Sequence, residues 1–350
     1  MIHSIIDDRR ITKTCALLVL FAMVLFTGCS ELGFQPGPPN GRGAGNGGGN
    51  GNGPGITGGV EAQDLQTCQE TGHEGLTAKY VNTTLNGGSM TVAPCDIGTY
   101  YDEDGHSVRG VSITGTTDGA KSEQFGVYSN GASLDVSHTD VTVEDDYPHQ
   151  FISIGYLYGA SGSIADNTIE GAHRVGILLD REGTDARVTG NSVTGTGAQT
   201  TGWAENGIQI SRGATGKISG NTVSDHWWDL NNFGSSGIIV NGSDDVHIRD
   251  NELSNNDYSI ALAGNGNKVL HNRVVNDARS TVNLGVYVSG SNNKLVQNSL
   301  GADGGTWGIY VFANSGNTKL IGNSLDGWDQ PIVDNGSDTK LPPPFDPENP

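Results

Sequence analysis

Two long loops carry aromatic, carboxylate and imidazole side chains close together in the sequence. They read GTGAQTTGWAEN at 195–206 and DHWWDLNNFGSS at 225–236, and they hold three of the five tryptophans. Sugar rings bind to flat apolar platforms that have polar groups at their edges, and aromatic side chains beside carboxylates and imidazoles provide both. The residues of interest in these loops are Trp203, Glu205, His226, Trp227, Trp228 and Asp229.

Polar groups in the preceding segments complete a candidate catalytic set. His149 lies in the run Tyr-Pro-His-Gln, and His173 and Arg174 come just before an apolar segment. Removal of the C5 proton of a uronic acid needs a cation to neutralise the carboxylate, a base, and an acid for the leaving oxygen or the opposite face. His149, His173, Arg174 and Glu205 could fill these roles. The alternative is that each is an ordinary loop or surface residue.

The elements that position these groups form a repeat. Between about residues 105 and 335, short segments with apolar residues at alternate positions are interleaved with an asparagine motif. Such alternation predicts strands, and one turn of short strands cannot bury its apolar side without stacking on the next. The sequence therefore predicts a solenoid with an asparagine ladder at one corner. The repeat asparagines are Asn167, Asn191, Asn221, Asn251, Asn272, Asn298 and Asn323.

The same alternation assigns faces to two strands near the long loops. The residues expected to point inward are Ile177, Leu179, Ile208 and Ile210. Asp180 and Gln209 are expected to point outward from one face, with Arg181 and Arg212 at its rim. Gln209 and Arg212 therefore join the candidate substrate-binding residues.

These repeats resemble the right-handed parallel β-helices of the pectate-lyase-like superfamily. The resemblance implies an all-β fold, with a single right-handed parallel β-helix of about nine coils over residues 105–340. That scaffold carries pectate and alginate lyases, mannuronan epimerases, polygalacturonases, phage tailspikes and non-catalytic surface proteins. Pro148 and His149 match half of the Asp-Pro-His-Asp signature of mannuronan epimerases, whereas Tyr147 and Gln150 replace its two acids.

The N-terminal segment has the features of an export signal. Three cations precede the apolar run CALLVLFAMVLF, which is too short to span a membrane and suits a signal peptide over residues 1–28. Its end, Phe-Thr-Gly-Cys-Ser, resembles the lipobox of prokaryotic lipoproteins, which implies lipid on Cys29. An ordinary secretory signal is the alternative. Residues 29–59, rich in Gly, Asn and Pro, should be a flexible linker that tethers the domain at the cell surface or outer membrane.

The remaining ends of the chain are expected to differ from the repeats. Residues 60–104 show weaker alternation and contain Cys68 and Cys95. In an exported protein such a pair should form a disulfide, so we expect an N-terminal cap pinned by this bond. Residues 341–350 form a Pro-rich tail.

The composition of the chain limits the classes of molecule that it is expected to bind. The formal net charge is −20, and only eight residues are lysine. Nucleic acid binding needs a cationic footprint, so nucleic acid is not expected as a partner. A local basic cleft could still bind an acidic glycan. Acidic clusters such as Glu144-Asp145-Asp146 suit Ca²⁺, but they are expected by chance in so acidic a chain, and no metal site or certain cofactor is assigned.

The sequence thus predicts a monomeric, lipid-anchored surface protein that acts on an acidic polysaccharide, as a lyase or C5-epimerase. The rival prediction is a non-catalytic carbohydrate-binding or adhesion module. A metal-delivery solenoid is disfavoured because runs of Met or His are lacking. A deep cleft with converging His and Arg would favour the enzyme, and a flat aromatic patch would favour the rival.

Overall fold

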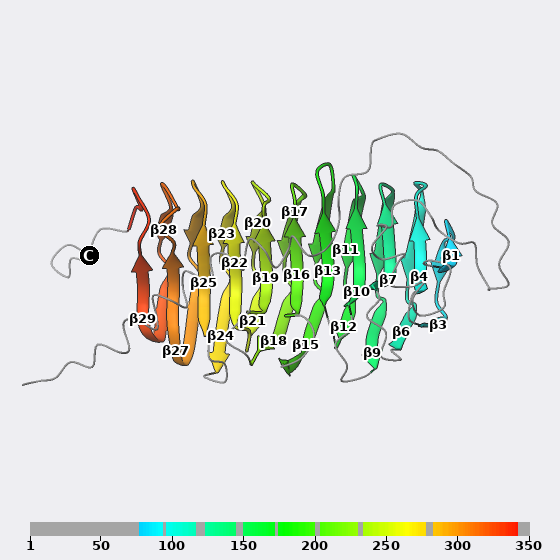
Figure 1. Ribbon diagram of the computed structural model, residues 1–350, viewed down its shortest axis with the longest axis horizontal. Helices are drawn as coiled ribbons and strands as arrows, with labels where there is room; N and C mark the ends of the chain where they lie inside the picture. The colour runs from blue at the N-terminus through cyan, green and yellow to red at the C-terminus, as the bar shows by residue number, and fades with distance from the viewer. Residues whose placement is uncertain are drawn as a thin grey trace, which may run out of the picture.

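The computed structural model describes residues 77–93, 96–116, 123–144, 150–171, 174–199, 204–229, 234–277 and 283–341. Over these residues the chain is a stack of short strands that advances steadily from β1 to β29, with the two ends of the stack far apart (Figure 1). Every strand pairing is parallel within this part of the chain, which contains no helix. No described helix could therefore span a membrane.

The strands form three columns along the stack. The first column contains β1 (Thr77–Val81), β4 (Asp96–Tyr101), β7 (Glu123–Asn130), β10 (Gln150–Leu157), β13 (Val175–Asp180), β16 (Asn206–Ser211), β19 (Ser236–Asn241), β22 (Tyr258–Ala263) and β25 (Leu284–Ser289). The second contains β3 (Ser89–Val92), β6 (Ser112–Thr116), β9 (Asp140–Glu144), β12 (Thr168–Glu170), β15 (Ser192–Gln199), β18 (Thr222–Trp228), β21 (Glu252–Ser254) and β24 (Arg273–Asp277). The long strands β27 (Ser299–Val311) and β29 (Ser324–Asp334) continue both columns and join them into one 19-stranded sheet.

The third column is a separate 10-stranded sheet. It contains β2 (Leu85–Asn86), β5 (His106–Arg109), β8 (Ser133–Ser137), β11 (Ser161–Ala165), β14 (Asp185–Thr189), β17 (Thr215–Ser219), β20 (His247–Arg249), β23 (Lys268–Leu270), β26 (Lys294–Val296) and β28 (Lys319–Ile321). Each coil runs from a first-column strand, round a tight corner, to a third-column strand and then to the second column. Neighbouring coils lie about 4.8 Å apart, as in any parallel sheet.

Alternation places the core inside the stack. Ile177, Leu179, Ile208 and Ile210 all belong to the continuous apolar core, as the sequence predicts. Asp180 and Gln209 lie on the other face of the same strands but are also buried. The prediction of an all-β parallel solenoid is therefore confirmed.

The repeat asparagines form the expected ladder at a corner. Asn191 donates from Nδ2 to Oδ1 of Asn221 at 2.9 Å, and Asn221 donates in the same way to Asn251 at 2.9 Å. The main-chain N–H of Asn191 also donates to Oδ1 of Asn221, and that of Asn221 donates to Oδ1 of Asn251. Equivalent bonds continue the ladder from Asn167 to Asn323. A buried corner thus satisfies its backbone groups with side chains from the next coil.

The solenoid begins earlier than the sequence pattern indicates. The segment expected to form a cap, residues 60–104, is described from residue 77 onward apart from residues 94 and 95. There β1 pairs with β4, β2 with β5 and β3 with β6, in the same three columns as the later coils. The described part of this segment is thus itself a coil. Cys29, Cys68 and Cys95 lie outside the described residues, so the lipid anchor and the disulfide stay predictions.

Candidate functional site

Arg174 and Glu205 occupy equivalent positions in adjacent coils. Each comes directly before a first-column strand, and the main-chain N–H of Asn206 donates to the Arg174 carbonyl at 2.9 Å. Both side chains are buried. The Arg174 guanidinium donates from Nη1 to the carbonyl of Ala204 at 2.9 Å. These two predicted catalytic groups therefore lie one above the other, within a closed corner of the stack.

Glu205 also lies beside His226, which comes from β18 in the next coil. Oε1 of Glu205 is 3.8 Å from Nδ1 of His226, and neither side chain is exposed. The carboxyl group accepts hydrogen bonds from the N–H and the hydroxyl of Thr196 at 3.0 and 3.1 Å. Neither imidazole nitrogen has a partner with full hydrogen-bond geometry among the described residues, although the Val193 backbone interacts with the ring. A Cβ at position 207 would lie 2.8 Å from Nε2 of His226, so Gly207 gives the ring its space.

Burial reverses the usual order of the two pKa values. Loss of water raises the pKa of Glu205 well above 4.5; the hydrogen bonds from Thr196 oppose this shift, and Asp257 and Asp225 add to it. Burial lowers the pKa of His226 from 6.5 to about 3, with the Val193 backbone opposing the shift. The favoured state is thus a protonated acid beside a neutral imidazole. Such reversed pairs are found at sites of proton transfer.

A second cluster lies at the corner between the first and third columns. We call Tyr158, Asp180, Arg181, Ser211 and Arg212 the corner site. Asp180 is buried, and it accepts hydrogen bonds from the Ser211 hydroxyl at 2.7 Å and from Nε of Arg212 at 2.8 Å. Nη2 of Arg212 forms an ion pair with the other carboxylate oxygen, and Nε of Arg181 lies 3.7 Å from it. One buried carboxylate therefore orients two arginines at the rim, where the sequence analysis placed them.

The backbone of the corner site is strained in three successive coils. Tyr158, Arg181 and Arg212 have left-handed φ angles of 57°, 77° and 53°. The equivalent corners before and after them are occupied by Gly131 and Gly242. A residue with a Cβ costs roughly 1–2 kcal/mol in this conformation, so glycine is the residue that the backbone favours. The same conformation occurs at other non-glycine corners of the described chain, so the corner site is distinguished by its side chains.

An aromatic ring completes the corner site. Tyr158 is 36% exposed, and the Arg181 guanidinium lies over its ring at 5.3 Å from the centroid. Both arginine side chains are partly exposed. The corner site thus presents two cations and one aromatic ring at the rim, while its carboxylate stays inside.

The other predicted binding residues are divided between interior and surface. Gln209 is buried on the outer face of β16, where it accepts a hydrogen bond from Nδ2 of Asn206 at 3.1 Å and donates one to the Ser211 hydroxyl at 3.2 Å. Trp228 is buried, Trp227 is half-buried, and Asp229 is exposed. These residues do not converge on one open cleft within the described part of the chain. His149, His173 and Trp203 lie outside the described residues, and their roles stay predictions.

Two features escaped the sequence analysis. Asp257 is buried and accepts hydrogen bonds from the N–H groups of Trp228 and Ser235 at 2.7 and 3.0 Å. Tyr158 completes the corner site, and its signal was available, since it occupies a turn where Gly131 stands one coil earlier. Within the described residues, no group of three or more His, Cys, Asp or Glu side chains could hold a metal ion.

The comparisons agree with this architecture. The family model described as "Right handed beta helix region" matches residues 79–234 and 152–325. The chain therefore belongs to the right-handed β-helix family. No curated protein sequence matches it.

Solved structures of low identity are similar. The Dettilon tailspike protein is 15% identical with a TM-score of 0.34, over 78% of this chain and 61% of the tailspike. The A-module of Azotobacter vinelandii mannuronan C-5 epimerase AlgE6 is 14% identical with a TM-score of 0.33, over 77% of this chain and 90% of the module. The A-module of AlgE4 from the same organism is 13% identical with a TM-score of 0.30, over 80% of this chain and 94% of that module. The chain spans about three fifths of the tailspike's length.

Proposed function

We propose that this β-helix acts on an acidic polysaccharide and holds one uronate unit at the corner site. The observation that carries the proposal is the set of three strained corners, where one aromatic ring and two arginines replace the glycines of neighbouring coils. A protein of net charge −20 has few cations, so two arginines gathered beside one exposed ring suit an anionic ligand.

The chemistry of the corner site suits a sugar acid. Guanidinium groups bind carboxylates through two parallel hydrogen bonds, and an exposed tyrosine offers a flat face and a hydroxyl to a pyranose ring. Asp180 fixes the direction of the arginines without cancelling both charges, because one carboxylate faces two cations. The corner site, as defined by its five residues, thus holds two cations and one carboxylate, which suits an anionic ligand.

The finer proposal is a lyase or C5-epimerase reaction. Either reaction removes the proton at C5 after the carboxylate is neutralised, and both need an acid and a base. His149, His173, Arg174 and Glu205 stay the proposed catalytic residues. Arg174 and Glu205 lie at the opposite ends of β13 and β16 from the corner site, so the sugar unit that reacts is a different one from the unit held there. The reversed pKa order of Glu205 and His226 supports a proton-transfer role for the pair.

A non-catalytic glycan-binding module is the second candidate. It is favoured by the burial of Arg174, Glu205 and His226, whose polar groups do not reach solvent. In that case the corner site binds the glycan, and the Glu205–His226 pair affects only the stability of the fold and its dependence on pH. Both candidates share the acidic polysaccharide as partner.

Product analysis separates the two candidates. Alginate and pectate should be incubated with the protein, and the unsaturated product of a lyase followed by its ultraviolet absorbance. Inversion at C5 would be followed by proton NMR. Binding without either product would support the non-catalytic module, and absence of both product and binding would refute the proposal.

Variants of the corner site test where the glycan binds. Tyr158→Ala removes an exposed ring, and the double variant Asp180→Asn with Arg212→Gln removes the ion pair without leaving a buried charge unpaired. Both should weaken binding on the order of tenfold, in line with about 1.4 kcal/mol for each tenfold change. Arg273→Gln, which removes an exposed arginine paired with Glu252, is the control. Equal effects of the control and the corner variants would refute the assignment.

The place of action follows from the N-terminal segment. We propose that lipid on Cys29 anchors the protein at the cell surface or outer membrane, and that residues 29–59 hold the solenoid away from the lipid. This proposal rests on the sequence of residues 1–59 alone.

A further inference from the structure

One outward position of the third column is basic in coil after coil. The parallel register aligns seven residues on successive strands or at the bridge that follows them, and we call this column the basic ladder. It consists of Arg187, Lys217, His247, Lys268, Lys294, Lys319 and Lys340. The residues that alternate with them, such as Val188, Ile218 and Leu295, belong to the core, so the ladder side chains point outward.

The basic ladder concentrates a scarce residue. Five of the eight lysines of the chain stand in this one column. Six intervals of about 4.8 Å give the column a length of about 29 Å. A protein of net charge −20 thus carries one narrow cationic line parallel to the solenoid axis.

Folding does not explain the column. Like charges directly opposite each other on neighbouring strands destabilise a sheet. Lys294 nevertheless stands between Lys268 and Lys319, without an intervening acid in the column. Asn, Thr or Ser at these positions would fold as well and would avoid the repulsion.

The ladder cations also lack the partners that other cations have. Arg212, Arg273 and Lys79 each lie within 4.0 Å of a carboxylate oxygen. Among the described residues, none of the lysines of the basic ladder makes such an ion pair, and neither does Arg187. Their charges are therefore available to a ligand.

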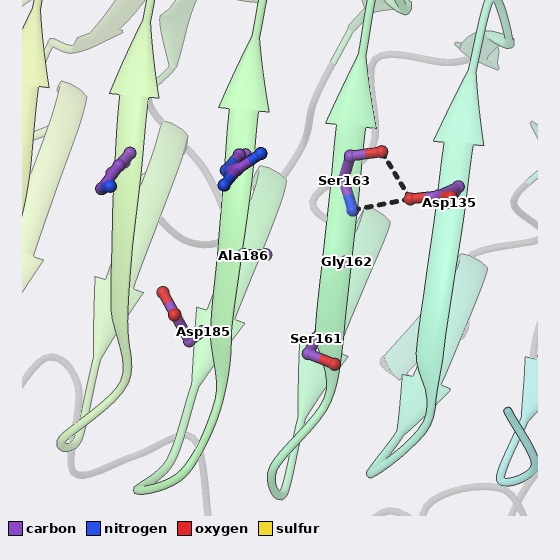
Figure 2. Close-up of a pocket in the computed structure, with 8 residues that line it drawn as sticks. Asp135, Ser161, Gly162, Ser163, Asp185 and Ala186 are labelled. Atoms are coloured by element: carbon purple, nitrogen blue, oxygen red, sulfur yellow. Dashed lines mark hydrogen bonds between the residues drawn. The ribbon is translucent and has the colours of Figure 1, made fainter.

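Two open grooves lie along the basic ladder. One, of about 450 Å³, is lined by Arg187 and Lys217, and Figure 2 shows its floor formed by neighbouring strands of the third column. At its end Asp135 accepts hydrogen bonds from the N–H and hydroxyl of Ser163, as the dashed lines in Figure 2 mark. The other groove, of about 340 Å³, is lined by Lys268, Lys294 and Lys319. His247 stands between the two grooves in the register.

We infer that the basic ladder binds a linear acidic polysaccharide along the solenoid axis, with anionic groups facing successive coils. This rests on the proposed function, because that function makes the polyanion a glycan. One sugar unit of an extended polyuronate is about as long as the rise of one coil, about 4.8 Å. Arg187 and Lys217 belong to the same coils as Arg181 and Arg212, so one end of the ladder lies in the coils that carry the corner site.

The residues beside the basic ladder suit a glycan better than a nucleic acid. The groove walls include Asp185, Asp245, Asn292 and Asn317, which can bond the hydroxyl groups of a sugar. Single-stranded nucleic acids are held by aromatic platforms in a cationic channel, and no aromatic side chain lines either groove.

His247 makes the basic ladder sensitive to pH. Its Nε2 lies 3.1 Å from Nζ of Lys268. Its pKa is lowered by partial burial first and then by Lys268, Lys217 and Arg249, whereas Asp245 acts in the opposite direction. A bound polyanion would offset the repulsion and favour the charged imidazole. Binding to the ladder should therefore tighten as the pH falls through the range of this histidine.

The test measures binding of the full mature chain to polymannuronate and polygalacturonate over a range of salt concentrations. The triple variant Lys268→Gln, Lys294→Gln and Lys319→Gln removes the centre of the basic ladder. The matched control, Lys79→Gln, Arg109→Gln and Arg273→Gln, removes the same charge elsewhere. We expect the ladder variant to bind on the order of tenfold or more weakly, and its slope of log affinity against log salt to fall by about three. The control should bind almost as tightly as the parent.

Stability measured on the same proteins excludes a structural explanation. Because the variant relieves repulsion, its free energy of unfolding should be equal to or higher than that of the parent. Parent-like affinity and salt slope in the ladder variant would overturn the inference and leave the proposed function intact. Tighter, ladder-dependent binding of single-stranded nucleic acid would overturn the glycan assignment. If the parent binds no polyuronate, the inference fails, and neutral glycans then decide whether the chain acts on any polysaccharide.

Discussion

Replacement of Glu205 by glutamine should change how stability depends on pH. In an unfolded chain the carboxyl group titrates near pH 4.5 and the imidazole of His226 near 6.5. In the fold, Glu205 keeps its proton to a much higher pH, and His226 stays neutral down to about pH 3. The free energy of unfolding changes with pH by about 1.4 kcal/mol per pH unit for each proton by which the unfolded and folded chains differ. It rises with pH where the unfolded chain holds more protons and falls where the folded chain does.

The two residues shift stability with pH in opposite directions. Between about pH 3 and 4.5 the unfolded chain holds one proton more than the folded chain, because His226 is protonated only when unfolded, so stability rises with pH. Above about pH 4.5 the unfolded chain loses the carboxyl proton and the folded chain keeps it, so Glu205 lowers stability as the pH rises toward its raised pKa.

Glutamine removes the carboxyl titration and leaves that of His226. The free energy of unfolding of Glu205→Gln, minus that of the parent, should be constant below about pH 4.5 and rise above it by about 1.4 kcal/mol per unit. The rise should continue until the pH reaches the raised pKa of Glu205 in the fold. The amide oxygen can still accept the hydrogen bonds from Thr196, so packing is retained.

Urea unfolding followed by circular dichroism measures this difference at a series of pH values. His226→Gln is the matched control, because it should lose the rise between about pH 3 and 4.5 and keep the fall at higher pH. A difference between Glu205→Gln and the parent that does not change with pH would show that Glu205 titrates in the fold as it does in water. That result would refute the reasoning about burial.

Three further predictions concern the frame and the ends of the chain. Asn251→Ala should lower the free energy of unfolding by about 3 kcal/mol or more, measured by urea unfolding, because it leaves the buried N–H and Nδ2 of Asn221 without their acceptor; a loss below 1 kcal/mol would contradict the ladder's role. Cys29→Ala should move the protein from the membrane fraction to the soluble fraction, and unchanged retention would count against the lipid. Mass spectrometry should find Cys68 and Cys95 joined, whereas two free thiols would exclude the bond.

The repetitive part of the fold could be predicted because its signals are local and recur. Alternation of apolar residues shows which side of a strand faces the core. Because the coils stack in parallel register, the same side faces the core in every coil. Ile208 and Ile210 show this directly, since both lie in the core. The asparagine ladder follows for the same reason. Residues 77–104 lack the repeated motif, so their place in the first coil depends on pairing with later strands that no local pattern reveals.

The candidate sites depend on register, which the sequence gives less directly. Arg174 and Glu205 lie in register in adjacent coils, but their burial depends on how the corner closes, and alternation does not describe corners. The basic ladder did have a signal in the sequence. Lys217 stands four residues before Asn221, and Lys294 stands four residues before Asn298. Aligning the chain on its repeat asparagines would have placed these lysines in one column.

Substitution of Arg181 separates an effect on glycan binding from an effect on the stability of the fold. Its left-handed φ of 77° matches that of Gly131 at 78°, so glycine can occupy the position without strain. Arg181→Gly relieves roughly 1–2 kcal/mol of strain. It also gives glycine's extra freedom to the unfolded chain, at a cost of about 0.5–1 kcal/mol. It loses the contact with the Tyr158 ring, worth about 0.5–1 kcal/mol, and the partly exposed ion pair with Asp180, worth about 0–1 kcal/mol.

These contributions nearly cancel, so Arg181→Gly should change the free energy of unfolding by less than about 1 kcal/mol. Arg181→Ala keeps the strain and loses the same contact, and it should therefore be less stable than the glycine variant in urea unfolding. Both variants should bind polyuronate more weakly than the parent, because both lose a guanidinium group at the corner site. If Arg181→Gly is as stable as the parent and binds polyuronate equally well, the strain at this corner serves no ligand, and the proposed position of the uronate must be abandoned.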